Sequence, residues 1–152
     1  MDDSEIYASV RRDLMRYATA LTGPDAADDV VSVVVTRSLA RSGGLAGLRE
    51  PKHYLMKSVL NEVRSRHRSQ ARRSEAPAAT YGAVDDIPDS STASIVDAVI
   101  ASLPPRQRAA AFLVFHEEYT PSEAAAVMGC RPATVRRYLH LARTRLREAL
   151  DG

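Results

Sequence analysis

Residues 119–150 read YTPSEAAAVMGCRPATVRRYLHLARTRLREAL, and this stretch decides the fold of the C-terminal part of the chain. Thr120 and Glu123 form a capping-box pattern, in which the hydroxyl accepts from the Glu123 N–H and the carboxylate returns the bond. Gly129 suits the left-handed conformation that ends a helix, and Pro132 can begin another helix three residues later. The spacing therefore predicts a short helix, a tight turn and a longer second helix.

The second of these helices has an apolar face and a cationic face. Its apolar residues recur every three or four positions, at Val135, Leu139, Ala142, Leu146 and Ala149. A helix-turn-helix with a basic second helix is typical of proteins that place this helix in the DNA major groove. We predict that Arg136, Arg137 and His140 reach base edges, because they lie near the start of the helix. Arg143 and Arg147 are then expected to meet phosphates.

The sequence of residues 51–73 predicts another helix, which begins at a proline and has an apolar side and a polar side. The apolar side carries Leu55, Met56, Val59, Leu60 and Val63. The polar side carries His53, Lys57, Asn61, Arg64 and Arg68. We expect the first side to pack into a core and the second to face a polar partner.

The remaining sequence also favours helices. Apolar periodicity predicts helices over 4–21 and from residue 24 or 25 to 39, and a glycine-rich loop over 42–50. Shorter helices are expected over about 94–102 and from the proline pair at 104–105 to about 116. Aromatic residues make up only 5% of the chain, which disfavours strands. The predicted fold class is all-α, with two small helical domains and a C-terminal helix-turn-helix.

The net charge of +2 is unevenly distributed. Residues 49–73 carry eight Lys or Arg and two acids, and residues 131–147 carry six Arg and no acid, so that each segment has a net charge of +6. Residues 74–93 carry four acids and no base, and their composition predicts a flexible linker that could extend roughly 65 Å. We therefore expect domains over 1–73 and 94–152. Basic helices of this kind are typical of phosphate-backbone binding.

Several classes of protein are disfavoured. No apolar run is long enough to span a membrane and the N-terminus is acidic, so we expect a cytoplasmic protein. The single cysteine, Cys130, predicts neither an internal disulfide nor a thiolate zinc site. The glycines at 43, 44 and 47 lack the spacing of a phosphate loop, and residues 116–118 lack the second histidine of a zinc-protease helix. We expect neither an enzyme nor a cofactor or metal.

The C-terminal motifs resemble region 4 of the extracytoplasmic-function (ECF) sigma factors, which belong to the sigma-70 family. The matching segments are residues 103–108, 119–125, 128–130, 134–137 and 142–146. The N-terminal part is similar to region 2 of the same family, through residues 16–18, 27–31 and 51–55, Asn61 and the basic tail that follows. The resemblance covers nearly the whole chain.

The resemblance implies a non-enzymatic sigma factor that directs promoter-specific transcription initiation by RNA polymerase. Region 2 would contact the β′ clamp helices through Asp28, Asp29, Val30, Val31 and Arg37. It would bind the minus-10 element through His53, Lys57, Asn61, Arg64 and Arg68. Region 4 would lie near the β flap and bind the minus-35 element through Thr134, Arg136, Arg137, His140, Arg143 and Arg147. The implied partners are core polymerase and promoter DNA. The resemblance leaves open whether an anti-sigma factor is a third partner.

The chain departs from the family pattern at several positions. Ser32, Val33 and Val35 replace the usual Gln-Glu and aromatic residue, and Tyr54, Arg131 and Tyr138 replace the usual Trp, Ser and Arg. The first group of departures changes the polar part of the expected clamp contact, and the second group predicts an unusual promoter preference. Two alternatives stay open, namely a LuxR-like regulator that acts alone at an operator and a protein that binds another helical partner. A LuxR-like protein would usually carry a sensing domain with strands, whereas residues 1–73 predict three helices.

Overall fold

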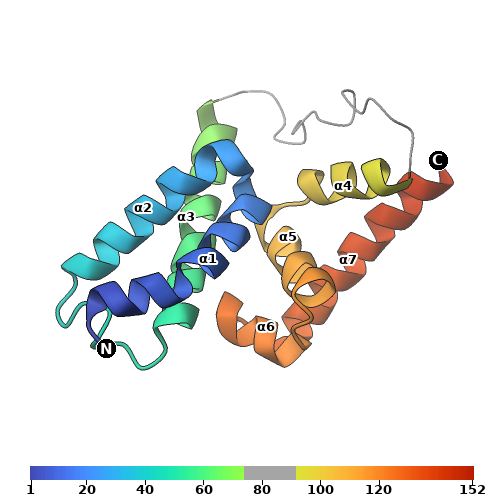
Figure 1. The fold of residues 1–152 in the computed structure, drawn as a ribbon. Helices are drawn as coiled ribbons and strands as arrows, with labels where there is room; N and C mark the ends of the chain where they lie inside the picture. Colours follow the sequence, from blue (N-terminus) through green and yellow to red (C-terminus); the bar gives the residue numbers. More distant parts are fainter. Residues whose placement is uncertain (74–91) are drawn as a thin grey trace.

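The computed structural model describes residues 1–73 and 92–152, and within these ranges every regular element is helical. The elements are α1 (Asp3–Thr22), α2 (Pro24–Ala40), α3 (Pro51–Arg73), α4 (Thr92–Ser102), α5 (Pro105–Ala111), the π-helical turn η1 (Phe112–His116), α6 (Pro121–Met128) and α7 (Pro132–Asp151) (Figure 1). The all-α prediction is confirmed. No helix in the described ranges is long and apolar enough to cross a membrane.

The helix boundaries follow the local sequence closely. Proline is the first residue of α2, α3, α5, α6 and α7, where its fixed φ suits a helix and its missing N–H costs no hydrogen bond. The predicted linker, residues 74–93, lies outside the described residues apart from its last two, which belong to α4. Helix α4 therefore begins two residues before the predicted position.

Helices α1, α2 and α3 form the N-terminal half, residues 1–73. All five apolar residues predicted for one side of α3 are buried, which confirms this side as a core face. They pack with buried residues of α1 and α2, including Leu14, Tyr17 and Val30, none of which is exposed to solvent. Leu45, in the loop between α2 and α3, is also fully buried.

Helices α4 to α7 form the C-terminal half, residues 92–152, and contain the predicted helix-turn-helix. The capping box is present, with the Glu123 N–H 3.1 Å from the Thr120 hydroxyl and the Thr120 N–H 3.0 Å from the Glu123 carboxylate. Gly129 ends α6 with a φ of +73°, as expected for a left-handed cap. Of the predicted apolar stripe of α7, Val135, Leu139 and Ala142 are buried, and Leu146 and Ala149 are half-buried.

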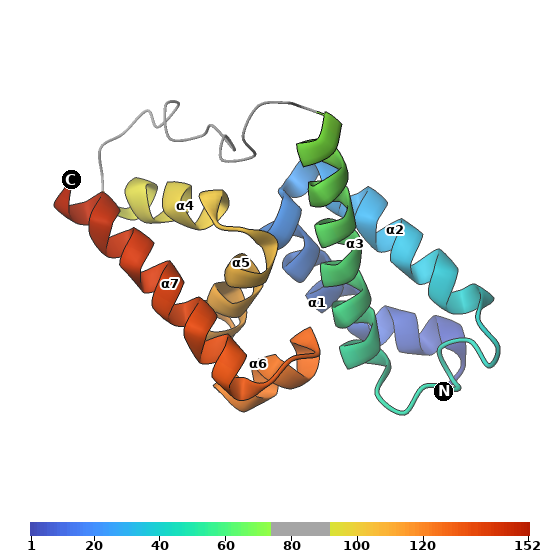
Figure 2. The ribbon, with the colours of Figure 1, turned by 180° about the vertical axis from the view of Figure 1, so that it is seen from behind.

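The two halves pack against each other along what we call the internal interface (Figure 2). Helices α1 and α3 contact α5, and α3 also contacts α6. One hydrophobic cluster extends through both halves and includes Tyr17 and Leu113. At the edge, the Arg16 guanidinium lies 2.8 Å from the Glu117 carboxylate. The sequence did not indicate this contact, because its partners are distant along the chain.

Candidate nucleic-acid interface

The polar side of α3 lies at the surface, as its periodicity predicted. Lys57, Asn61 and Arg68 are exposed, whereas His53 and Arg64 are half-buried. The Nδ1 atom of His53 lies 2.7 Å from a carboxylate oxygen of Glu50, at the end of the preceding loop. The Asn61 side chain makes no hydrogen bond to a described residue, so that its amide is free to bind a ligand.

A hollow of about 290 Å³ lies beside Asn61, between α2 and α3. We call it the α2–α3 hollow; it is lined by Val34, Arg37, Ser38, Tyr54, Ser58, Asn61, Glu62 and Ser65. Tyr54 is 40% exposed, and the Arg41 guanidinium carbon lies 5.7 Å from the centroid of its ring. Neither Arg41 nor Ser58 was predicted from the sequence to be a site residue. The spacing of Tyr54, Ser58, Asn61 and Ser65, by four, three and four residues, was the available signal.

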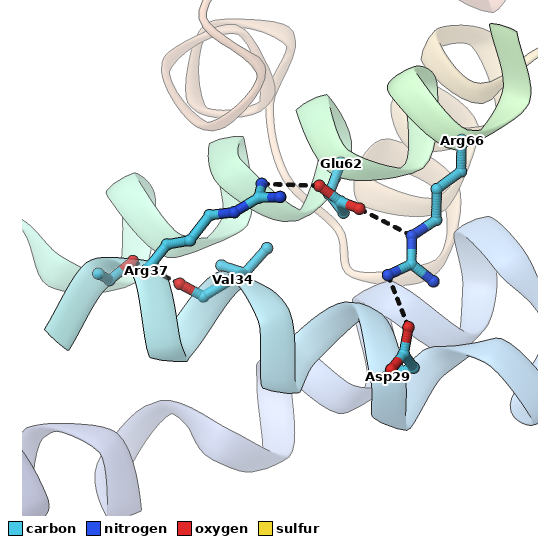
Figure 3. Close-up of polar contacts among 6 residues, drawn as sticks. Asp29, Val34, Arg37, Glu62 and Arg66 are labelled. Atoms are coloured by element: carbon cyan, nitrogen blue, oxygen red, sulfur yellow. Dashed lines mark hydrogen bonds and ion pairs between the residues drawn. The ribbon is translucent and has the colours of Figure 1, made fainter. Parts of the chain in front are cut away.

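A chain of ion pairs joins α2 to α3 beside this hollow (Figure 3). Glu62 accepts from Arg37 at 2.8 Å and from Arg66 at 2.8 Å, and Arg66 also lies 2.6 Å from Asp29. Burial alone would raise the pKa of the Glu62 carboxyl, but the hydrogen bonds and charges of Arg66 and Arg37 hold it below its usual value. The network therefore links the two helices that form the hollow.

The exposed face of α7 carries the second predicted set of cations. Arg136, Arg137, His140, Arg143 and Arg147 are exposed, and Thr134 is half-buried. The Arg143 guanidinium carbon lies 5.1 Å from the centroid of the Phe115 ring, which belongs to η1. A guanidinium over an aromatic face is attracted to it, which restricts the side chain without neutralising its charge.

The internal interface covers part of the polar side of α3. A Cβ atom built on Gly129 would lie 2.6 Å from the Lys57 Cε, so that the Lys57 stem packs directly against the turn between α6 and α7. Burial lowers the pKa of Arg64, and the nearby Arg106 and Arg68 lower it further. Asn61 and the α2–α3 hollow lie on the neighbouring part of the helix surface, where Asn61 remains exposed.

The chain has a clear relative among known proteins. Residues 93–146 match the family described as "Sigma-70, region 4". The chain is 31% identical over 157 residues to the RNA polymerase sigma-E factor of Streptomyces avermitilis, in an alignment that covers 97% of this chain and 85% of that protein. The chain belongs to the ECF sigma factors of the sigma-70 family. It is therefore an RNA polymerase sigma factor that directs promoter-specific transcription initiation, and the LuxR-like alternative is not favoured.

The same fold is found in a solved structure of the sigma factor RpoE of Bartonella quintana in complex with the anti-sigma factor NepR. The TM-score is 0.69 at 22% identity, with 97% of this chain and 96% of that chain covered. The coverage includes both halves of this sigma factor. The likeness confirms the all-helical architecture of the described residues.

The residues that were predicted to contact core polymerase differ in their exposure to solvent. Asp28, Asp29 and Arg37 are exposed on α2 of the sigma factor. Val30 and Val31 are 0% and 2% exposed, because the inner face of α2 packs in the core. In the free chain these two valines support α2 from the core side.

Proposed function

We propose that this sigma factor divides a promoter between its two cationic surfaces. The α2–α3 hollow and the polar side of α3 bind unpaired bases and backbone of the minus-10 element. The exposed face of α7 reads the minus-35 element as duplex. The observation that carries the proposal is the position of Asn61, exposed at the rim of a hollow that also holds an exposed aromatic ring.

The chemistry of the hollow suits a base that has left the double helix. An aromatic face such as that of Tyr54 can stack on any base, and an amide such as that of Asn61 can both donate to and accept from a base edge. Lys57 and Arg68 are exposed on the same helix and supply charge for the adjoining phosphates. Because Tyr54 stands where the family usually has Trp, a smaller stacking surface is expected.

The chemistry of α7 suits an intact duplex. Arg136, Arg137 and His140 lie in the first half of the helix, where a helix-turn-helix protein contacts base edges in the major groove. Arg143 and Arg147 lie one and two turns further on, at the height expected for backbone phosphates. Residues 131–147 contain no acid, so that nothing in this segment repels the DNA.

We further propose that α2 docks on the β′ clamp helices of core polymerase through Asp28, Asp29 and Arg37, and that the C-terminal half lies near the β flap. In this function the chain works in the cytoplasm and has no catalytic chemistry or cofactor of its own. Leu39, on the same helix, is 45% exposed and offers an apolar contact to the polymerase. Val30 and Val31 are buried in the free chain and do not offer such a contact.

The experiment is reconstitution of the purified chain with core polymerase on a mapped promoter. Wild type should comigrate with core and open the duplex, as detected by permanganate reactivity of unpaired thymines. Asn61→Ala should lower this reactivity severalfold and leave comigration unchanged. Thr36→Ala, which removes an exposed hydroxyl from α2 outside the hollow, serves as the control.

Two outcomes would contradict the proposal. Permanganate reactivity that is the same for Asn61→Ala and wild type would remove Asn61 from the minus-10 site. Tight, sequence-specific binding of the free chain to duplex DNA without comigration with core would instead favour a regulator that acts alone.

A further inference from the structure

A second hollow lies within the internal interface, next to Arg64 and Arg68 of α3. Its volume is about 250 Å³, and it lies between the C-terminal part of α3, the start of α5 and α7. Arg64, Arg68 and Arg106 line it together with Pro104, Pro105 and Tyr138. A larger hollow of about 520 Å³ shares Arg106 and Tyr138 with it and extends to Arg131. We call the two together the arginine cleft.

The arginine cleft is cationic on both sides and contains no acid. Neither hollow has an Asp or Glu among its lining residues. Elsewhere in the described residues, Arg16, Arg37 and Arg66 each lie within 3 Å of a carboxylate. In contrast, Arg64, Arg68, Arg106 and Arg131 form no ion pair within residues 1–73 and 92–152. The one polar contact in this group is from Arg106 to the Tyr138 hydroxyl, at 3.4 Å.

The positive charges in the cleft repel each other and therefore oppose the packing of the two halves that forms the cleft. Arg64 and Arg68 belong to the N-terminal half and Arg106 to the C-terminal half, so that their repulsion acts across the internal interface. The lowered pKa of Arg64, caused by burial and then by Arg106 and Arg68, is a sign of this repulsion. An anion between these groups would convert the repulsion into attraction.

The kind of anion follows from the donors and the space. The guanidinium group presents its N–H donors as a planar fork that binds phosphate oxygens in pairs. Three or four such groups around one cleft match a ligand with several phosphates better than a single monovalent ion. The volumes approach those of small-molecule sites and would hold a phosphate chain with or without a nucleoside.

We propose that the arginine cleft binds a small anion with a polyphosphate chain and that the bound anion holds the two halves together. Arg106 is the central residue, because it lines both hollows and is not part of either proposed DNA surface. If the proposed function is correct, the anion also competes with minus-10 DNA for Arg64 and Arg68. The site itself does not depend on that function.

The test measures anion binding to the full chain by titration calorimetry, without DNA or polymerase and at constant ionic strength. The probes are inorganic tripolyphosphate, ATP and sulfate. Tripolyphosphate should bind at one site, at least tenfold more tightly than sulfate. Tighter binding of ATP than of tripolyphosphate would assign the nucleoside a contact, and equal binding would assign the site to the phosphate chain alone.

Two variants with the same change of charge separate the cleft from general attraction to a basic protein. Arg106→Gln should weaken tripolyphosphate binding at least tenfold. Arg147→Gln, on the exposed face of α7 and outside both hollows, should weaken it less than twofold. Both side chains are exposed, so neither change should prevent folding.

Small-angle X-ray scattering provides the second measurement. Tripolyphosphate should reduce the radius of gyration of wild type and of Arg147→Gln but not that of Arg106→Gln. Equal loss of binding in the two variants, or the absence of one-site binding of tripolyphosphate, would overturn the proposal. Because no promoter is present, these results do not depend on whether Asn61 binds the minus-10 element.

Discussion

The Arg108 guanidinium, which belongs to α5, donates a 2.7 Å hydrogen bond to the Leu21 carbonyl oxygen in the last turn of α1. It also donates to the carbonyl oxygens of Leu103, at 3.1 Å, and of Ala101. Arg108 is only 6% exposed, so that these carbonyls take the place of water around its charge. Carbonyls in the last turns of helices carry partial negative charge, which makes them suitable partners for a buried cation. One side chain therefore connects the ends of α1 and α4 across the internal interface.

Replacing Arg108 with Met should destabilise the chain by about 2–4 kcal/mol. The change removes charge-assisted hydrogen bonds and leaves partly buried carbonyls without a donor. Urea unfolding followed by circular dichroism measures the loss. Arg12→Met, on the exposed surface of α1, should change the free energy of unfolding by less than about 0.5 kcal/mol. Similar values for the two variants would show that Arg108 does not join the halves in solution.

The contact between Lys57 and Gly129 can be measured with a double-mutant cycle. Gly129→Ala should cost about 1 kcal/mol for the left-handed φ, and the exposed end of the Lys57 side chain should move away from the added Cβ at little further cost. In a Lys57→Ala background only the first cost should remain, so that the coupling between the two positions should be below about 0.5 kcal/mol. Gly23→Ala is the control, because φ there is +86° but no atom lies within 4 Å of the added Cβ. A coupling well above this value would mean that the Lys57 side chain is held rigidly against the turn.

The ion pairs of Glu62 should make stability depend on pH in a defined range. The pKa of Glu62 in the folded chain lies below its usual value of 4.5, so its stabilisation is fully present above that value. It is lost as the pH falls through the lower pKa of the folded state. The Glu62 side chain is 11% exposed, and Glu62→Gln should therefore cost about 1 kcal/mol at neutral pH.

Urea unfolding of wild type and Glu62→Gln should give a constant difference from pH 8 to about pH 5 that narrows in more acidic solution. Glu148→Gln, an exposed position on α7, should show no such trend. A difference that is independent of pH down to about pH 3 would show that packing, and not charge, accounts for the role of Glu62.

The two groups of arginines on α7 should differ in what they contribute to promoter binding. In the holoenzyme, Arg137→Ala should relax preference at one base pair of the minus-35 element by about 1–3 kcal/mol. Arg147→Ala should weaken all sequences equally and reduce the slope of log affinity against log salt by about 0.9. Competition binding with duplexes permuted across the element measures both effects. Unchanged sequence preference in Arg137→Ala would assign Arg137 to the backbone.

Features set by neighbouring residues could be predicted from the sequence. The capping box at Thr120, the left-handed Gly129 and the apolar side of α3 all depend on residues within a few positions of each other. Val30 and Val31 were assigned to the polymerase contact from a family motif, without regard to their helical phase. Buried residues of α2 recur at spacings of three and one, and this pattern alone would have placed both valines inside.

The internal interface could not be predicted in the same way. Arg108 appears in the sequence as one more surface cation, and only the fold shows that it is buried among carbonyls of distant helices. The ion pairs of Glu62 with Arg37 and of Arg66 with Asp29 likewise join residues on different helices. Pairing charges across helices requires their relative rotation, which no local pattern supplies.

The aromatic contact between the halves gives the closed arrangement a dependence on temperature. The rings of Tyr17 and Phe112 lie 6.2 Å apart, and Tyr17 is completely shielded from solvent. Parting the halves would wet these rings and their apolar neighbours, and hydration of such surface raises the heat capacity. Apolar association weakens on cooling. Cooling should therefore weaken the packing of the two halves against each other before it disrupts the helices within either half.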